Sequence, residues 1–238
     1  MYLIGIGFLG FISILSKDFI LTRPQPWKEP FINLNPVLAY VSGIALILTA
    51  VCVMTHRFRR ASLLIIINLI LFLATSRHII NLWRDYINGF KSLVLISGAL
   101  LILAELNPSS KNKKLILWTT LVSLFMFFAT CAYAHFTLAV FVQELIPKFI
   151  PFRLFFTYFA GVCLFLGGLG LLLPKTQKLA ALLSGIMITG WFFLLHIPRA
   201  FTEINVLSEC IGVGESFSIA GICFMVYGIL NVEKKQNL

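Results

Sequence analysis

Two stretches of the sequence carry a histidine followed seven residues later by a carboxylate: His78 with Asp85, and His196 with Glu203. A histidine takes up and releases a proton near neutral pH, and a nearby carboxylate can orient its ring and stabilise its charged form. On an α-helix a separation of seven residues returns to the same face, so each pair can line one groove. The spacing therefore predicts two sites suited to proton transfer, 118 residues apart.

The composition identifies the solvent that surrounds these groups. Of the 238 residues, 59% are hydrophobic and only 12% are charged, and the mean hydropathy is +0.96. A chain with so few polar residues cannot coat a water-soluble globule, so we expect an integral membrane protein. The apolar runs are too long and too continuous for the alternating strands of a β-barrel, which leaves an all-α helix bundle.

Runs of about 17–25 apolar residues are long enough to cross the hydrocarbon as helices. We predict a polytopic bundle of eight transmembrane helices, over residues 2–21, 37–55, 61–82, 90–106, 115–142, 152–173, 179–200 and 211–230. The even number divides the chain into two four-helix units, residues 1–110 and 111–238. The same count places both termini on one side of the membrane.

Basic residues predict the orientation, because short cytoplasmic loops retain Lys and Arg. The predicted cytoplasmic face carries ten of them: Arg57, Arg59, Arg60, Lys111, Lys113, Lys114, Lys175, Lys178, Lys234 and Lys235. Only Glu105 and Glu233 oppose them on that face. Both termini of this multi-pass protein are therefore expected in the cytoplasm. The overall net charge of +10 reflects this topology and contact with anionic lipid, and it gives no reason to expect nucleic acid as a partner.

Ionisable side chains within spans are costly and mark functional sites by default. Seven residues form the predicted site, a polar layer near the outer membrane surface: Lys17, His78, Asp85, His135, His196, Glu203 and Glu215. Glu215 lies in the run GVGESFSIAG, where a buried carboxylate could accept a hydrogen bond from His196 or from the Lys17 ammonium. The alternative is that the histidines only hydrogen-bond between helices or reach interfacial water.

Sliding the sequence by 118 residues, without a gap, superposes several identical or similar residues. Tyr40 falls on Tyr158, Gly43 on Gly161, and His78-Ile79 on His196-Ile197. The basic loop HRFRR falls on PKTQK, Asp85 falls on Glu203, and Lys17 falls on His135. This agreement predicts two parallel, pseudo-symmetric repeats related by an axis along the membrane normal.

The repeated unit resembles the DoxX-type membrane proteins. The features that carry the resemblance are an amphipathic outer loop after the first span, a glycine in the second (Gly43, Gly161), a short basic turn and the ending H-x4-[WF] of the third (His78, His196). The resemblance implies a bacterial cytoplasmic-membrane protein. In some relatives such a protein is a small subunit of a quinone-linked oxidoreductase, and in others it is a membrane partner of redox or thiol-handling enzymes.

Two cofactor chemistries suit a polar layer of this kind. In a quinone site, an imidazole with a nearby carboxylate takes the hydroxyl proton of a quinol, while apolar side chains enclose the quinol ring. The candidate side chains for enclosing the ring are Phe127, Phe128, Tyr133 and Trp191. In a haem site the symmetric pair His78 and His196 would ligate the iron. Haem is disfavoured because histidines in separate four-helix units lie too far apart. We expect no metal site and no cofactor resident in this chain.

Of the two copies, the second is expected to be chemically competent, because it adds His135 to His196 and brings Glu203 and Glu215 within reach. A protein partner in a membrane complex is expected as well. A non-catalytic scaffold, assembly factor or small-solute carrier is the alternative, and the Pro-rich loop over residues 22–36, with Trp27 as an interfacial anchor, favours it. Whether the protein is an enzyme stays open at this stage.

Overall fold

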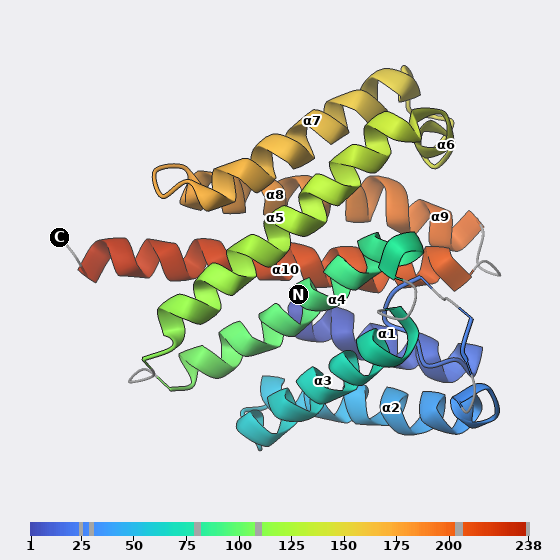
Figure 1. The fold of residues 1–238 in the computed structure, drawn as a ribbon, viewed down its shortest axis with the longest axis vertical. Coiled ribbons are helices and arrows are strands. Elements are labelled where there is room, and N and C mark those ends of the chain that lie inside the picture. Colours follow the sequence, from blue (N-terminus) through green and yellow to red (C-terminus); the bar gives the residue numbers. More distant parts are fainter. Residues whose placement is uncertain (24–25, 29–30, 79–81, 108–110, 203–206, 237–238) are drawn as a thin grey trace.

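The computed structural model describes residues 1–23, 26–28, 31–78, 82–107, 111–202 and 207–236. These residues fold into helices, and no strand occurs among them (Figure 1). Such a fold is expected in hydrocarbon, because a helix satisfies its backbone hydrogen bonds internally. The all-α prediction is confirmed for the described part of the chain.

The helices follow one another as two series with similar order. The first series is α1 (Tyr2–Ser16), α2 (Phe31–Met54), α3 (Arg59–Leu73), the π-helical turn η1 (Ala74–His78) and α4 (Leu82–Glu105). The second is α5 (Lys113–Thr137), α6 (Ala139–Glu144), α7 (Arg153–Leu172), α8 (Gln177–Trp191), the π-helical turn η3 (Phe192–His196), α9 (Ile197–Thr202) and α10 (Leu207–Gln236). Helix α10 runs through the middle of the bundle and packs against α1, α4 and α8 (Figure 1).

Seven segments within the described residues are long and apolar enough to cross a membrane, one fewer than predicted. The difference lies in the first span, which was expected over residues 2–21. Helix α1 ends at Ser16, where Lys17 adopts a left-handed conformation with φ of 53°. At about 1.5 Å per residue its 15 residues cover about 22 Å, less than the hydrocarbon core of about 30 Å.

The apolar residues that extended the predicted first span belong to a connection that folds back onto α1. Phe19, Ile20 and Leu21 are fully buried there. The Ser13 hydroxyl donates to the carbonyl of Ile20 at 2.8 Å, and the Phe19 N–H donates to the Asn35 side chain at 3.0 Å. Apolar content alone could not distinguish this buried loop from the end of a helix.

Two other predicted boundaries also moved. Helix α2 begins at Phe31, so the predicted outer loop is shorter than residues 22–36, and Pro36 lies within the first turns of the helix. Pro36 is the sixth residue of α2, so the carbonyl of Ile32, four residues earlier, receives no N–H donor from it. The predicted fifth span over residues 115–142 breaks at Leu138, between α5 and α6.

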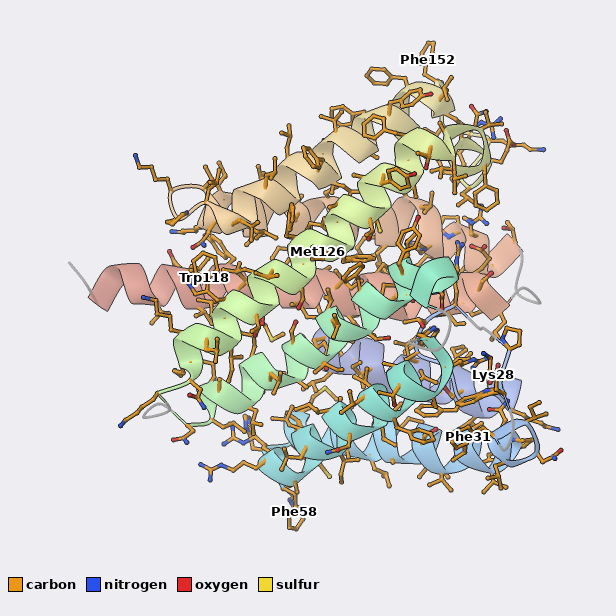
Figure 2. All side chains as sticks on the ribbon, viewed as in Figure 1. Lys28, Phe31, Phe58, Trp118, Met126 and Phe152 are labelled. Atoms are coloured by element: carbon orange, nitrogen blue, oxygen red, sulfur yellow. The ribbon has the colours of Figure 1, made fainter. Side chains whose placement is uncertain are left out.

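The bundle has two distinct ends. The turns around residues 55–58 and 173–176 lie at one end, on the left of Figure 1, and α6, α9 and the connection after α1 lie at the other. Figure 2 shows Phe58 at the first end and Lys28 and Phe31 at the second. Met1 and Met54 line one shared hollow, so α1 starts beside the end of α2.

The third helix of each series has the same internal pattern. The bounds of α8 and η3 lie 118 residues after those of α3 and η1, and each π-helical turn ends at a histidine. A duplicated ancestor would produce such an offset. The division into repeats over residues 1–110 and 111–238 stays a prediction.

The outer surface is largely apolar, as lipid contact requires. Large hydrophobic side chains are exposed along the helices, including Val41, Leu48, Phe155 and Leu183, and only 28–56% of each candidate span is buried inside the protein. A soluble monomer rarely exposes apolar surface on this scale. Composition, helix length and surface therefore identify an integral, multi-pass membrane protein in contact with the bilayer.

Helices α1 and α2 cross where neither has a side chain. A Cβ atom added to Gly43 would lie 2.6 Å from the Gly10 carbonyl oxygen, and one added to Gly10 would lie 2.7 Å from that of Gly43. Small residues allow this approach, which gives the van der Waals contact that holds helices together in lipid.

Gly43→Ala is therefore expected to destabilise the protein by about 1–3 kcal/mol, because the two backbones must move apart. Gly190→Ala is the matched control, since no atom lies within 4 Å of the Cβ it would add. Thermal unfolding of the purified protein in mild detergent measures both. A Gly43→Ala variant as stable as the control would contradict the close crossing.

The two ends of the bundle also predict a labelling pattern. Arg57→Cys and Lys175→Cys should react with a membrane-impermeant maleimide from one side of the membrane, and Lys148→Cys from the other, because their turns lie at opposite ends. The unsubstituted chain, with its five native cysteines, gives the background. Equal labelling of all three variants from one side would be inconsistent with a spanning bundle.

Candidate functional site

The end of the bundle that carries α6 and α9 holds a layer of buried polar side chains. Its members come from the connection after α1, from η1 and from the N-terminal halves of α4 and α10, and the partly buried His196 of η3 lies beside them. The local sequence favours the two π-helical turns. In η1 the hydroxyls of Thr75 and Ser76 donate to carbonyls four residues earlier, and Pro198, just after η3, has no N–H to offer the carbonyl of Leu194.

His78 is the centre of a fully bonded network in the first series. Its Nδ1–H donates to Asp85 Oδ2 at 2.5 Å, and the hydroxyl of Thr22 lies 2.8 Å from Nε2. The second carboxylate oxygen of Asp85 accepts from the Asn88 amide at 2.5 Å. Asp85 lies at a kink in α4, with φ of −131°, which turns its carboxylate toward His78. The predicted contact between histidine and carboxylate is present here.

The order of hydroxyl, imidazole and carboxylate is the one that activates a nucleophile in hydrolases. Burial argues against that use, because Thr22 and His78 are each 1% exposed and Asp85 is 5% exposed. A substrate does not reach the hydroxyl in this conformation. The network instead fastens the connection after α1 to η1 and α4.

A second network lies beside the first and corrects the role predicted for Trp27. The Arg77 guanidinium binds both carboxylate oxygens of Asp18 at 2.9 Å and lies 4.8 Å from the centre of the Trp27 ring. The indole N–H of Trp27 donates to the same Asp18 carboxylate at 2.9 Å. Trp27 is only 8% exposed, so it packs inside the protein and is not an interfacial anchor.

Glu215 is partnered by a residue that the sequence did not single out. The Lys91 ammonium, on α4, lies 2.6 Å from Glu215 Oε2, on α10, and so joins the two series of helices. The other oxygen, Oε1, is buried and is the only such side-chain atom without a hydrogen bond among the described residues. Lys17, the donor suggested by the sequence, is exposed at the end of α1.

His196 lies on the same side of α10 as Glu215. The His196 ring packs against Gly212, since a Cβ atom added to Gly212 would lie 2.7 Å from the His196 Nδ1. Gly212 precedes Glu215 by three residues, which is about one helical turn. Lys91 lies within electrostatic range of the ring. The ring forms no hydrogen bond within the described part of the chain. Glu203, its predicted carboxylate, lies outside the described residues.

Three residues after His196, Arg199 forms an ion pair in which two of its nitrogens bind one carboxylate. Its Nε and Nη2 donate to the two oxygens of Glu209 at 2.6 Å each, and Nη1 donates to the carbonyl of Leu145. The pair ties α9 to the start of α10 and to the residue after α6. Both side chains are mostly buried.

His135 has a local partner rather than a carboxylate. Its Nδ1–H donates to the carbonyl of Cys131 at 2.8 Å, and its ring stacks on Trp191 with centroids 6.3 Å apart. Trp191 and His135 therefore form one aromatic wall. Of the other predicted walls, Phe128 is fully buried in the core and Tyr133 is exposed on the surface of the protein.

The geometry also bears on metals. Both ring nitrogens of His78 are engaged, by Asp85 and Thr22, so neither is free to ligate a haem iron. Within the described ranges, no three His, Cys, Asp or Glu side chains converge as a metal site would require. The layer offers a hydrogen-bond acceptor, the unpaired oxygen of Glu215.

Comparisons with known proteins add one finding. A family model described as a domain of unknown function (DUF8561) matches residues 124–209, about a third of the chain. The matched segment runs from α5 to the start of α10 and includes His135 and His196, but not Glu215. Neither the curated proteins nor the solved structures gave a match.

The buried network around His78 predicts how the free energy of unfolding changes when His78 is replaced. His78→Ala leaves the buried Asp85 carboxylate without its closest partner, which typically costs about 3–5 kcal/mol. Thr75→Val, in the same π-helical turn, is the control, because Thr75 is exposed and its hydroxyl bonds only to local carbonyls. Thermal unfolding should show a large loss for His78→Ala alone. Equal stability of the two variants would assign His78 a role other than packing.

Proposed function

We propose that this membrane protein binds a protic ligand of the quinol class in the polar layer between its two series of helices and serves as an ancillary subunit of a redox enzyme. The observation that carries the proposal is Glu215. It is 6% exposed, one of its oxygens pairs with Lys91, and the other oxygen is buried without a partner. Native proteins rarely leave such an atom unpaired, and an unmet acceptor suits a hydroxyl donor from a ligand.

The surrounding groups support this chemistry. Oxidation of a quinol releases two protons and two electrons, so a site needs proton acceptors as well as an electron acceptor. Glu215 and His196 offer proton acceptors near one another, whereas the ring nitrogens of His78 are already engaged. The electron acceptor would belong to the partner enzyme. Among the histidines, His196 is thus the one proposed to exchange protons.

The resemblance to the DoxX-type proteins supports the same proposal from the sequence. Some members of that family work as small subunits of quinone-linked oxidoreductases, and the repeated histidines and basic turns carry the likeness. The basic residues at the end that holds residues 55–58 support a cytoplasmic location for that end, in a bacterial inner membrane.

A non-catalytic scaffold or assembly factor is the second candidate, and one observation favours it. The pairs His78–Asp85, Arg77–Asp18 and Arg199–Glu209 are internally satisfied, as in a layer built for packing. Under this alternative, Lys91 and Glu215 only fasten α4 to α10.

Quinone retention discriminates the two candidates. The protein purified from native membranes in mild detergent should carry close to one quinone per chain, and Glu215→Gln should lower this severalfold because the acceptor charge is lost. Glu144→Gln is the control, since Glu144 is exposed and its ion pair within the described residues is with Arg153. Extraction and mass spectrometry quantify the quinone. A wild-type protein without bound quinone would refute the quinol site.

A further inference from the structure

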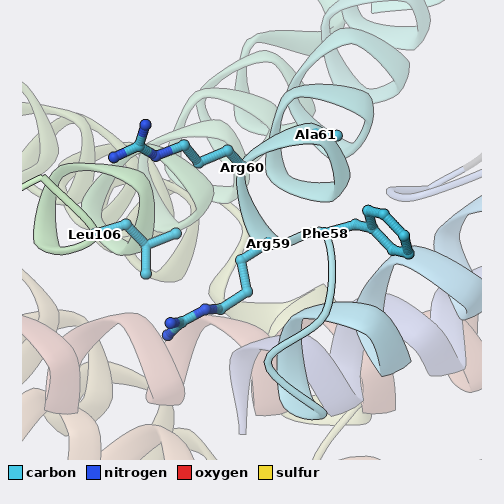
Figure 3. A pocket seen from close by; sticks show the side chains of 5 residues that line it. All are labelled: Phe58, Arg59, Arg60, Ala61 and Leu106. Atoms are coloured by element: carbon cyan, nitrogen blue, oxygen red, sulfur yellow. The ribbon is translucent and has the colours of Figure 1, made fainter.

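The opposite end of the bundle carries a hollow that the proposed function does not use. Its volume is about 390 Å³, and it is lined by Phe58, Arg59, Arg60, Ala61 and Leu106. It lies where α3 begins and where the chain leaves α4 (Figure 3). We propose that this hollow binds the phosphate headgroup of an anionic phospholipid.

The arginines provide the charge for such a ligand. In Figure 3 the guanidinium groups of Arg59 and Arg60 flank the side chain of Leu106, one on each side. Neither group forms an ion pair or a hydrogen bond with any residue that the structure describes. The neighbouring Lys113, by contrast, pairs with Glu105 at 2.9 Å. A guanidinium presents a planar fork of N–H donors that matches phosphate oxygens, so two of them fit one phosphodiester.

The position of the hollow selects lipid over a soluble phosphate. Its apolar lining residue Leu106 lies between the two cations, as the junction of a headgroup with its acyl chains requires. The end of the bundle on which it lies is rich in Lys and Arg, and such juxtamembrane clusters attract anionic lipids. A volume of about 390 Å³ exceeds that of an inorganic phosphate and lies within the usual range for small-molecule pockets.

The turn before the hollow supports the same assignment. Phe58 is 79% exposed and has a left-handed backbone, with φ of 46°, which is unusual for a bulky residue. Its ring points away from the arginines in Figure 3. An exposed apolar ring at the membrane edge can insert among the acyl chains, so Phe58 can anchor the turn while Arg59 and Arg60 reach the headgroups.

Native mass spectrometry of the full chain in mild detergent tests the proposal, with palmitoyl-oleoyl phosphatidylglycerol and palmitoyl-oleoyl phosphatidylcholine as probes. The wild-type protein should bind phosphatidylglycerol more tightly than phosphatidylcholine. The double variant Arg59→Gln with Arg60→Gln should bind phosphatidylglycerol at least about tenfold more weakly than the wild type does. Arg57→Gln is the matched control, because Arg57 lies in the same basic turn but does not line the hollow. An equal loss of phosphatidylglycerol affinity in the Arg57→Gln control would overturn the proposed site, because the lipid would then be held by the general positive charge of the turn.

A second variant and a competition experiment complete the test. Leu106→Trp fills the hollow and retains both arginines, so it should reproduce the loss even if the double variant fails to fold; wild-type affinity in this variant would overturn the proposal. Inorganic phosphate at millimolar concentration should not displace the lipid. Displacement by phosphate would identify a site for the free anion instead.

Discussion

A charged or polar group in hydrocarbon must find its partner within the protein, and this constraint governs the end of the bundle that carries α6 and α9. Arg77, whose side chain is almost fully buried, is paired with Asp18 from a different element. Arg199 and Glu209, on α9 and α10, satisfy each other in the same way. Because each pair joins separate segments, meeting the electrostatic requirement also fixes how the connections and helices are arranged.

The π-helical turns provide the geometry for these pairs. A π turn inserts one additional residue into a helix and so rotates the residues that follow it relative to those before it. In both series the turn ends at the histidine, although the sequences ATSRH and FFLLH share only that residue. The position of the turn is therefore common to both series, whereas the side chains around it differ. This explains how two histidines at equivalent positions have such different surroundings.

The two series differ in how completely their polar groups are satisfied. In the first, Thr22, His78 and Asp85 form a closed network that water and ligands do not reach. In the second, no comparable contact of His196 with a carboxylate lies within the described part of the chain, and Glu215 keeps one oxygen unpaired. A network whose hydrogen bonds are all made within the protein suits a structural role, whereas a buried acceptor without a partner suits the binding of a ligand. The two histidines thus differ in their neighbours rather than in their positions along the helices.

Composition and hydropathy were enough to predict an all-α membrane bundle, because the absence of water dictates helices and their length. The spacing of seven residues predicted the contact between His78 and Asp85, but the two residues lie on separate elements, η1 and α4, and Asp85 lies at a kink rather than on a continuous helical face. Thr22 and Lys91 could not be found in this way.

Thr22 and Lys91 come from segments distant in the sequence from the residues they contact, and only the packing of helices brings them together. The role of Trp27 was reversed for the same reason: its amphipathic ring suits both an interface and a buried cation, and only the folded position of Arg77 decided between them. The sequence determines which groups must be paired, and the tertiary structure decides with which partner, because pairing depends on distances that local periodicity does not encode.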